Sequence, residues 1–372
     1  MRIGVPKEIK VHEYRVGMIP AAVREAVMHG HEVWVEHDAA VRQGLTNEDY
    51  KKAGARIVES AEEIFAKCEL IVKVKEPQPE ECKRLRPGQT IFTYLHLAPD
   101  PGQTKALLEA GVTAIAYETV TNARGGLPLL APMSEVAGRM AVQAGAHCLE
   151  MEQGGRGMLL GGVAGVAPAK VVVLGGGVSG VNAARMAIGL EAQVTVLDIN
   201  VERLYAIDQQ FGASVNTIFS TRAAVEEHVL DADLVIGAVL VPGAAAPKLI
   251  TEQMVKDMKR GSVFVDISID QGGCSETSRP TTHAAPTYVE HDVVHYCVAN
   301  MPGAVARTST FALNNATLPF VLALADKGPL KAMLDDPHLL AGLNVHEGKI
   351  TYAAVAAALG LAHVDARKAL VR

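Results

Sequence analysis

The stretch KVVVLGGGVSG, residues 170–180, joins an apolar run to a glycine-rich turn near the middle of the 372-residue chain. The apolar run predicts a buried β-strand, and the residues after Gly180 have the pattern of a helix. Gly175, Gly177 and Gly180 match G-x-G-x-x-G, whose glycines permit a tight turn, a close approach of pyrophosphate to the backbone, and close packing of helix on strand. The pattern alone is weak evidence in a chain with 34 glycines. Its place between a strand and a helix makes a dinucleotide-binding turn the favoured interpretation.

The next predicted strand, AQVTVLD, ends at Asp198, which is 18 residues beyond Gly180. An acidic residue about 20 residues after the glycine turn is typical of dinucleotide sites, where it binds the ribose hydroxyls. Its carboxylate would accept hydrogen bonds from both hydroxyls and repel a 2′-phosphate, so the sequence favours NAD over NADP. The alternative interpretation is an ordinary turn of a parallel sheet in which Asp198 caps a helix.

The composition is that of a globular protein of about two domains. Hydrophobic residues make up 49% of the chain and charged residues 20%, and the formal net charge is -6. Because Lys and Arg form no block, nucleic acid and anionic membranes are not the expected partners. The segment 158–181 approaches the length of a membrane span, but Pro168, Lys170 and its glycines favour a strand and a turn.

Two features of the sequence point to the cytoplasm. The first ten residues are charged from Arg2 onward and show no apolar core of a signal peptide. The five cysteines are far apart and form no C-x-x-C pair, which is typical of reduced thiols inside a cell. We therefore expect a cytoplasmic protein.

Strand-like and helix-like segments alternate twice along the chain, which predicts mostly parallel sheets covered by helices. The first alternation fills residues 1–120, and the second begins at Lys170. We therefore expect an α/β fold with two Rossmann-like, doubly wound parallel-sheet domains. Two long helices, near 134–152 and 304–325, are the candidate connectors of these domains. The first carries small and apolar residues on more than one face, which is typical of a helix buried between two bodies.

Short signals mark the ends of several predicted helices. Ser60 with Glu63 has the pattern of a capping box, in which each side chain bonds a backbone N–H at the start of a helix. Gly30, Gly54 and Gly111 each follow a helical pattern, where glycine can adopt the left-handed conformation that ends a helix. These signals predict one helix start and three helix ends in the first alternation.

The central position of the glycine-rich turn predicts how the chain is divided. If the second long helix returns the chain to the first body, the nucleotide-binding domain is an insertion. We expect a discontinuous substrate and catalytic domain of residues 1–129 plus 307–372, and an NAD-binding Rossmann domain of residues 130–306. The tail, residues 326–372, is helical by pattern and suggests no chemistry.

Ionisable residues stand at the ends of three predicted strands, where the ligands of parallel sheets collect. Lys73 and Lys75 would share one face of the strand IVKVK, and Lys75 is the better placed because it stands at the C-terminal end. His96 ends the strand TIFTYLH, and Asp270 follows VFVDISI. Arg15 lies between a strand and a helix, where a lone Arg is usually solvated. A hydride-transfer enzyme needs such groups to hold its substrate and to move protons.

A set of longer motifs, spread from residue 1 to about residue 320, resembles the alanine dehydrogenase family in content and in order. Motifs of this length and number are highly specific, and they cover both expected domains. They are MRIGVPKEIK-x₄-RV, VKVKEP, YLHLA, PLLAPMSEVAGRMA, GGGVSGVNAA, VTVLD, VDISIDQGGC-x-ETSRPTTH and VVHYCVANMPGAVARTST.

The resemblance implies a two-domain subunit whose catalytic domain is formed by both ends of the chain. It implies reversible, NAD-dependent oxidative deamination of L-alanine to pyruvate and ammonia by a homohexamer. Carried over by motif, Arg15 and Lys75 would bind the substrate, the guanidinium at the carboxylate and the ammonium at the carbonyl or amine end. His96 would be the general acid/base, and Asp270 would assist proton transfer, with water, at the iminium and carbinolamine stages.

The resemblance also implies a set of NAD contacts. The glycine turn and Asp198 are supported by the residues themselves, and the other contacts by the resemblance alone. No metal is expected. The implied contacts are Ser134, Gly175, Gly177, Val178, Ser179, Gly180, Asp198, Arg203, Ser220, Val239, Leu240, Ile267, Ser268, Ile269, Asp270, Arg279, Val298, Ala299, Asn300 and Met301.

Three residues depart from the family's pattern. Arg203 and Arg279 stand where members can carry Lys, which keeps the charge but changes its reach. Glu191 replaces a glycine that is common at that helix end, so the turn there is expected to differ.

His291 and His295 have a spacing that metal ligands use on helices, but they lie around a strand-like segment, so we expect no metal site there.

Two other enzyme classes compete with this interpretation. An NAD(H)-binding component of a proton-translocating transhydrogenase shares the architecture but has no need of Arg15, Lys75, His96 and Asp270 together. A saccharopine-type dehydrogenase binds a far larger substrate and would need further basic residues in an open cleft. A non-catalytic NAD-binding protein has no feature of the sequence in its favour.

Overall fold

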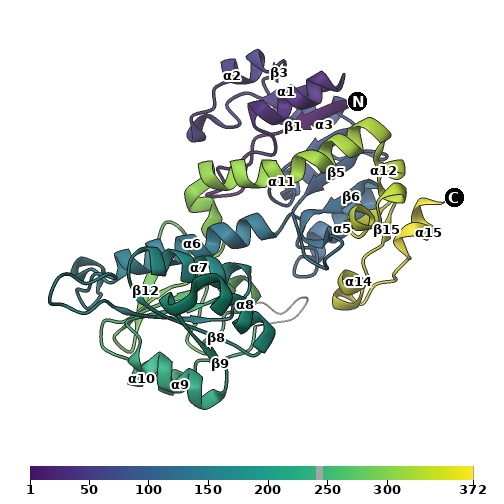
Figure 1. The fold of residues 1–372 in the computed structure, drawn as a ribbon. Helices are drawn as coiled ribbons and strands as arrows, with labels where there is room; N and C mark the ends of the chain where they lie inside the picture. The colour runs from purple at the N-terminus through teal and green to yellow at the C-terminus, as the bar shows by residue number, and fades with distance from the viewer. Residues whose placement is uncertain (240–245, 372) are drawn as a thin grey trace. The chain divides into compact units, whose positions relative to one another are not determined.

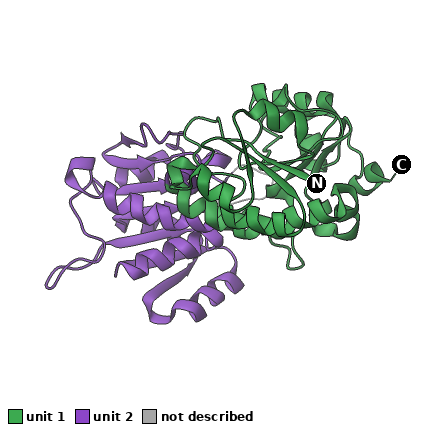
Figure 2. Ribbon diagram, turned by 90° about the horizontal axis from the view of Figure 1, so that it is seen from above, with its two compact units in different colours: residues 1–133, 305–372 green, residues 134–304 purple. Residues whose placement is uncertain are grey.

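The computed structural model describes residues 1–239 and 246–371. The chain forms two compact units, drawn in green and purple in Figure 2. Unit 1 comprises Met1–Met133 and Val305–Arg372, and unit 2 comprises Ser134–Ala304. Unit 2 is therefore an insertion between two segments of unit 1.

Two long helices lie where the chain passes from one unit to the other (Figure 1). The first boundary, between Met133 and Ser134, falls inside the first turn of α6 (Ala131–Cys148). The second boundary precedes Val305, and α11 (Ala306–Lys327) begins with the next residue. These two helices correspond to those expected near 134–152 and 304–325.

Unit 1 contains an eight-stranded sheet in the order β15-β14-β6-β5-β4-β1-β2-β3. Strands β1 to β6 are parallel. From β1 the chain adds β2 and β3 on one side and then returns to add β4, β5 and β6 on the other, which is doubly wound topology. The neighbouring strands β1 and β4 thus form the switch point, where the side on which strands are added reverses. The strands are β1 Arg2–Val5, β2 Glu32–Glu36, β3 Arg56–Val58, β4 Leu70–Val72, β5 Thr90–Thr93, β6 Thr113–Ala116, β14 Leu343–His346 and β15 Lys349–Ile350.

The tail departs from its sequence-based expectation, because it contains strands as well as helices. β14 pairs antiparallel with β6, and a tight turn returns the chain into β15. The turn residues Glu347 and Gly348 have φ values of 46° and 76°, the left-handed pair that closes a two-residue hairpin. All four residues of β14 are buried, so the C-terminal segment completes the sheet of unit 1.

The helices of unit 1 flank its sheet and end largely as expected. Gly30, Gly54 and Gly111 have φ values of 85°, 96° and 63°, which confirms the predicted left-handed helix ends. The predicted capping box at Ser60 and Glu63 is wrong: Ser60 precedes α3, but its side chain makes no cap hydrogen bond. The helices are α1 Pro20–Met28, α2 Asn47–Lys52, α3 Ala61–Lys67, α4 Pro79–Cys82, α5 Pro101–Ala110, α12 Pro329–Asp335, α13 Pro337–Leu340, α14 Ala353–Leu359 and α15 Ala366–Leu370.

Unit 2 contains a seven-stranded sheet in the order β12-β13-β11-β10-β7-β8-β9. All neighbours are parallel except β12, which forms a hairpin with β13 through the left-handed residues His291 and Asp292. The parallel strands repeat the doubly wound order of unit 1, with β7 and β10 at the switch point. The strands are β7 Lys170–Leu174, β8 Gln193–Asp198, β9 Val215–Phe219, β10 Leu234–Gly237, β11 Val263–Asp266, β12 Thr287–Glu290 and β13 Val293–Tyr296. The helices are α7 Val178–Gly189, α8 Val201–Phe211, α9 Arg222–Asp231 and α10 Glu252–Asp257.

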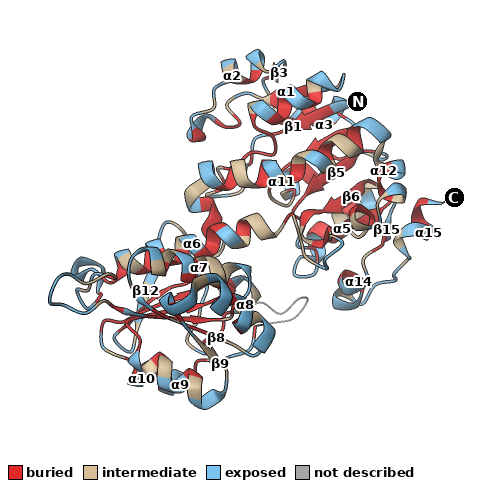
Figure 3. Cartoon of the chain, viewed as in Figure 1, coloured by how far each residue is buried: buried red, intermediate tan, exposed pale blue. Residues whose placement is uncertain are grey.

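The strands of each sheet form the centre of its unit, and the helices expose one face to solvent (Figure 3). In unit 2, Val171 and Val173 of β7 pack in one cluster with Ala183 and Ala187 of α7 and with Ile236 of β10. Short side chains on α7 let the helix lie close to the sheet. The expected fold class, two Rossmann-like α/β domains, is confirmed, with antiparallel strands added at the sheet edges. No helix within the described residues is long and apolar enough to cross a membrane.

Candidate functional site

Three of the sequence-predicted residues follow the carboxyl ends of strands in unit 1. Arg15 lies in the segment after β1, and Lys75 and His96 come three residues after the last residues of β4 and β5. One expectation is wrong: β4 ends at Val72, so Lys73 and Lys75 do not belong to a regular strand with a shared face. The backbone N–H groups of Val74 and Lys75 bond to a side-chain carboxylate, that of Glu8, instead of to a neighbouring strand.

A glycine brings the segment that carries Arg15 onto the end of β4. A Cβ atom on Gly17 would lie 2.3 Å from the carbonyl oxygen of Val72 and 3.1 Å from the nitrogen of Lys73. No side chain fits at that distance, so Gly17 permits the close crossing. The crossing places the Arg15 segment beside the segment that leads to Lys75.

The Arg15 guanidinium is buried and oriented by Glu13. Its Nε and Nη2 donate to the two carboxylate oxygens of Glu13 at 2.7 and 2.6 Å, and its Nη1 contacts the Met133 sulfur at 2.9 Å. Burial alone would raise the pKa of Glu13, but the hydrogen bonds and charge of Arg15 outweigh it, and the charge of Lys75 acts in the same direction. The pKa of Glu13 is therefore lowered to about 2. The forked pair holds Arg15 in a single orientation close to Lys75.

His96 is exposed and adopts a left-handed backbone conformation, with φ of 49°. The Glu118 carboxylate, just beyond β6, accepts a hydrogen bond from the backbone N–H of His96 at 2.6 Å and further ones from Leu95. The imidazole stacks on the ring of Tyr94, with centroids 5.9 Å apart and planes inclined by 16°. A non-glycine residue in this region is strained by about 1–2 kcal/mol. Glu118 and Tyr94 together offset that strain and aim the ring.

Tyr94 connects His96 to Arg15. Burial raises the pKa of the Tyr94 hydroxyl, and the nearby positive charge of Arg15 acts in the opposite direction. The hydroxyl donates to the carbonyl oxygen of Leu129 at 2.5 Å, which fixes the ring on which the imidazole stacks. Unit 1 therefore gathers a guanidinium, an ammonium and an imidazole at adjacent strand ends.

The glycine-rich turn of unit 2 joins β7 to α7 at the switch point, as the sequence predicts. Gly175 has φ of 99°, and a Cβ there would lie 2.7 Å from the carbonyl oxygen of Ala238. A Cβ on Gly180 would lie 1.8 Å from the carbonyl oxygen of Gly175, so only glycine allows the helix to lie this close. A Cβ on Gly177 would meet nothing within 4 Å. The open side of the turn, at Gly177 and the N-terminus of α7, is where a pyrophosphate fits.

Asp198, at the end of β8, lies beside this turn. Its carboxylate accepts from the N–H of Gly176 at 2.6 Å and from the N–H of Asn200 at 2.8 Å. The alternative interpretation of Asp198 as a helix cap is disfavoured, because Asn200 supplies the side-chain cap of α8 by accepting from the N–H of Arg203. The Arg203 side chain turns back and donates from Nε to the carbonyl oxygen of Gly176. The carboxylate and the turn thus meet as a ribose and pyrophosphate site requires.

Asp270 is exposed on a short 3₁₀ helix, Ile267–Gln271, directly after β11. The buried carboxylate of Asp266 accepts from the N–H groups of Ser268 and Cys274, each at 2.9 Å, and from the hydroxyl of Ser278 at 2.6 Å. Burial raises the pKa of Asp266, and these hydrogen bonds act against that rise. Asp266 therefore fastens both ends of the segment that carries Asp270. Asp270 belongs to unit 2, whereas Arg15, Lys75 and His96 belong to unit 1.

Most of the other expected NAD contacts also stand at carboxyl ends of strands in unit 2. Ser220 follows β9, Val239 follows β10, and residues 298–301 follow β13. Ser134 lies in α6, and Leu240 lies outside the described residues. Arg279 is exposed, and its guanidinium carbon lies 3.8 Å from the centre of the ring of Tyr288 on β12. The segments that carry these strand-end contacts lie along one edge of the sheet in the same order as the strands they follow, β13-β11-β10-β7-β8-β9.

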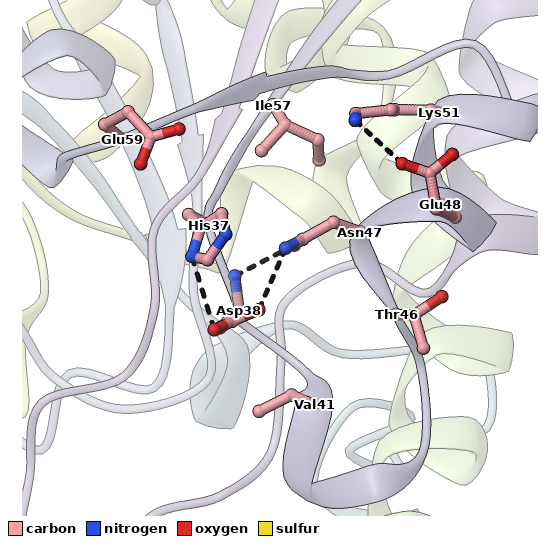
Figure 4. A pocket seen from close by; sticks show the side chains of 9 residues that line it. All are labelled: His37, Asp38, Val41, Thr46, Asn47, Glu48, Lys51, Ile57 and Glu59. Carbon is pink, nitrogen blue, oxygen red and sulfur yellow. Dashed lines mark hydrogen bonds and ion pairs between the residues drawn. The ribbon is translucent and has the colours of Figure 1, made fainter.

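A pocket of about 560 Å³ lies elsewhere in unit 1, beyond the ends of β2 and β3 (Figure 4). Asp38 and Asn47 exchange hydrogen bonds of 2.9 and 2.8 Å within it, and none of the expected site residues lines it. Its lining is His37, Asp38, Val41, Thr46, Asn47, Glu48, Lys51, Ile57 and Glu59. Among residues 1–239 and 246–371, no group of three or more His, Cys, Asp or Glu side chains is arranged to hold a metal ion.

Two family models match consecutive parts of the chain. The N-terminal domain of alanine dehydrogenase/PNT matches residues 4–137, and the C-terminal domain matches residues 141–353. The chain belongs to the alanine dehydrogenase family. The resemblance seen in the sequence motifs is therefore confirmed, and the chain is an oxidoreductase of this family.

Several relatives match the chain from end to end. The alanine dehydrogenase of Halomonas elongata is 64% identical over 98% of this chain and 99% of its own length. That of Mycolicibacterium smegmatis is 55% identical and covers both chains completely. A solved L-alanine dehydrogenase superposes with a TM-score of 0.94 at 52% identity, covering 97% of this chain and 99% of its own. A transhydrogenase from Sinorhizobium meliloti gives a TM-score of 0.81 at 25% identity, over 95% and 100% of the two chains.

The structure adds four carboxylates that sequence reasoning missed. Each of them accepts a hydrogen bond from a backbone N–H group near an expected site residue. The four are Glu8, Glu13, Glu118 and Asp266. Two of them carry a signal that could have found them. Glu118 ends the motif AIAYE after β6, and Asp266 ends β11, so both satisfy the strand-end criterion that selected His96. The partners of Glu8 are distant in sequence, and no local pattern indicates them.

Proposed function

We propose that this protein catalyses the reversible, NAD-dependent oxidative deamination of L-alanine to pyruvate and ammonia. The observation that carries the proposal is the end-to-end similarity to alanine dehydrogenases at 64% and 55% identity. The strand-end positions of Arg15, Lys75 and His96 in unit 1 support it. So does the glycine turn with Asp198 in unit 2.

In this proposal unit 1 binds the substrate. Arg15, already oriented by Glu13, binds the substrate carboxylate through its guanidinium. Lys75 places a positive charge at the carbonyl or amine end and polarises the carbonyl of pyruvate in the reverse direction. His96 accepts a proton as alanine is oxidised and returns it in the reverse reaction. Its exposed ring, stacked on Tyr94, is accessible for that transfer.

Unit 2 binds NAD in this proposal. The open turn at Gly177 would accept the pyrophosphate, and the Asp198 carboxylate would bind the ribose hydroxyls and disfavour NADP. The other contacts implied by the family resemblance are proposed with them. NAD, when bound, supplies the acceptor for the hydride that leaves the alanine Cα. Asp270 assists the proton transfers that involve water.

The test is formation of NADH by the purified protein with NAD and L-alanine, with NADP, glycine and L-lysine as comparisons. We expect turnover with NAD and L-alanine. His96→Ala and Asp270→Asn should each lower kcat by about 10²- to 10⁴-fold, the usual contribution of a general acid or base. His96→Ala should bind NADH as the wild type does, because His96 is not one of the proposed NAD contacts. Asp270→Asn should also weaken NADH binding, because Asp270 is one of them.

Failure of the wild type to turn over L-alanine, with NAD still bound, would contradict the proposal. It would favour the second candidate, an NAD(H)-binding component of a transhydrogenase, which the structural likeness to the Sinorhizobium meliloti protein supports. A hydride exchange assay between NADH and an NADP analogue, with the partner component added, would then be the decisive measurement.

We also propose a cytoplasmic homohexamer. The support is the family resemblance, together with five buried, unpaired cysteines, as expected of a reducing compartment. Sedimentation equilibrium should give six times the subunit mass of 39.3 kDa. A monomer or dimer at assay concentrations would contradict the assembly without affecting the proposed reaction.

A further inference from the structure

Three ionisable side chains are buried together beside the β1/β4 switch point of unit 1. The Lys73 ammonium donates to Glu8 at 3.0 Å and to Glu81 at 2.7 Å. The exposed fractions of the Lys73, Glu8 and Glu81 side chains are 0%, 2% and 1%. We call these three residues the switch-point triad. None of them is among the expected substrate or NAD contacts.

The position of the triad is unusual for a doubly wound sheet. In such sheets the crevice at the carboxyl ends of the switch-point strands is where ligands bind. In unit 2 the corresponding strands, β7 and β10, carry the glycine turn. In unit 1, Glu8 follows β1 and Lys73 follows β4, so the protein's own charges fill this place. Because Glu8 and Lys73 occupy a ligand-binding position without being expected to bind the ligand, we expect another role for them.

The triad holds the backbone that leads to Lys75. One carboxylate oxygen of Glu8 binds the Lys73 ammonium, and the other accepts from the N–H of Val74 at 2.7 Å and that of Lys75 at 3.3 Å. β1 ends at Val5, so no strand residue is available for these two N–H groups. The Glu8 carboxylate thus accepts the backbone hydrogen bonds that a longer β1 would otherwise accept.

The opposite edge of the same segment is held by β5 and its surroundings. The carbonyl oxygen of Val74 accepts from the N–H of Tyr94 at 3.2 Å, and that of Lys75 accepts from the Thr93 hydroxyl at 2.8 Å. The carbonyl oxygen of Lys73 accepts from the Tyr117 hydroxyl at 2.9 Å. The backbone of residues 73–75 is therefore hydrogen-bonded on both sides. Only on the Glu8 side is the acceptor a carboxylate that is itself held by an ion pair with Lys73.

Glu81 anchors the triad to the next helix. Its second oxygen accepts from the N–H of Gln78 at 2.8 Å, which completes a capping box at the start of α4. Burial alone would lower the pKa of Lys73, but the two carboxylates outweigh it and the pKa is raised. Lys73 therefore stays protonated at neutral pH and does not serve as a base. Its environment is that of a fixed counter-ion.

We propose that the switch-point triad is a positioning device for Lys75, in which Glu8 fixes the Val74–Lys75 backbone, Lys73 fixes Glu8, and Glu81 fixes Lys73. The inference rests on the proposed function, in which Lys75 binds the substrate. A buried ion triad brings little net stability compared with apolar side chains of similar size. A role in placing the Lys75 ammonium accounts for charges that packing alone does not require.

The decisive variant is Glu8→Asp, which keeps the charge but is one methylene too short to reach both Lys73 and the backbone N–H groups. We expect kcat/KM for pyruvate to fall by about 10²-fold, the effect of displacing a binding group by about 1 Å. Most of the loss should be a rise in KM for pyruvate, because Lys75 is displaced from its substrate. The Kd for NADH, which reports on unit 2, should not change.

Two further variants separate positioning from folding. Lys73→Met/Glu81→Gln keeps the net charge of the triad but removes the counter-ion of Glu8, so it should lower Tm and show the same rise in KM for pyruvate. Gln89→Leu is the matched control, because Gln89 is equally buried but binds the carbonyl oxygens of Phe65 and Cys68 just before β5 begins. It should lower Tm and leave the KM for pyruvate unchanged.

Each outcome has a distinct meaning. Glu8→Asp or the double variant with a wild-type KM for pyruvate would overturn the triad proposal and leave the proposed function intact. A loss of activity that follows Tm, and that Gln89→Leu shares, would reduce the triad to a structural element. No turnover of L-alanine by the wild type would overturn the proposed function, and this inference with it.

Discussion

At the scale of single residues, the expected site depends on carboxylates that bind backbone rather than substrate. Glu118 is the plainest case, because it holds His96 in a left-handed conformation with φ of 49°. Charge-assisted hydrogen bonds to two successive N–H groups are about twice as strong as neutral ones. The strained residue is thus stabilised by a side chain from the neighbouring strand end.

Replacing Glu118 should therefore act on His96. We expect Glu118→Ala to lower kcat for pyruvate reduction by about 10²-fold, because the ring would be misplaced relative to the substrate. Glu118→Gln keeps an acceptor for one N–H and should retain more activity than the alanine variant. Steady-state kinetics checks both, with NADH binding as the reference. Equal activity of wild type and Glu118→Ala would show that His96 keeps its place without this carboxylate.

Glu13 gives a stability prediction with a defined pH window. Its pKa is lowered from an ordinary 4.5 to about 2, so its ion pair with Arg15 stabilises the folded state fully above pH 4.5. That contribution is lost as the pH falls from 4.5 toward 2, because protonation breaks the pair. The difference in unfolding free energy between wild type and Glu13→Gln should shrink across this range in urea titrations. A difference that is constant with pH would contradict the assignment.

Glu191 tests the cost of a left-handed residue directly. It stands where the family commonly has glycine, and the turn keeps a left-handed conformation, with φ of 61°. We expect Glu191→Gly to stabilise unit 2 by about 1 kcal/mol, since glycine adopts this conformation without strain. Glu227→Gly, at an exposed position inside α9, should instead destabilise it by about 1 kcal/mol. Thermal unfolding compares the two, and the same sign for both would count against this explanation.

At the scale of elements, the strand–turn–helix unit from β7 to α7 separates two roles of glycine. Gly177→Ala should fold normally, because its Cβ would meet no atom within 4 Å, but it should weaken NADH binding by occupying the space of the pyrophosphate. Gly180→Ala should destabilise unit 2 by about 1–3 kcal/mol or more, because its Cβ would lie 1.8 Å from a carbonyl oxygen. Fluorescence titration with NADH and thermal unfolding distinguish the two effects.

The opposite pattern would be informative. A Gly177→Ala variant that loses stability while keeping its NADH affinity would mean that the open side of the turn is needed for packing rather than for the cofactor. The proposal for the cofactor site would then rest on Asp198 alone.

At the scale of the whole molecule, an inserted unit predicts separable responses to ligand. NADH at about 100 times its Kd should stabilise unit 2 by about 2.7 kcal/mol, by mass action on its folded state. Calorimetry should show that the transition assigned to unit 2 moves to higher temperature. Gly177→Ala should show a smaller shift at the same NADH concentration. An unchanged transition of unit 2 at saturating NADH would contradict the assignment of the cofactor to this unit.

Much of the fold followed from local patterns. The apolar run before Gly175 indicates β7, the strand and helix alternation indicates doubly wound sheets, and glycines at 30, 54 and 111 mark helix ends. Each of these signals depends on a few consecutive residues, because periodicity and left-handed conformations are local properties. The strand-end criterion also selected Lys75 and His96 as site residues, and their roles stay predictions.

The tertiary structure decided what depends on residues far apart in the chain. The sequence pattern places Lys73 on one face of a strand. In the structure Lys73 instead binds Glu8, 65 residues earlier in the chain, and belongs to a buried triad. The chain end reads as helical, but β14 completes the sheet beside β6, more than 200 residues before it. A hydrogen-bond partner from another strand end is set by topology, and topology follows from burying all the apolar faces at once. Sequence patterns therefore determined the α/β fold class and the glycine-rich turn of this protein. Only the folded chain determined which charged side chains hold its expected site in place.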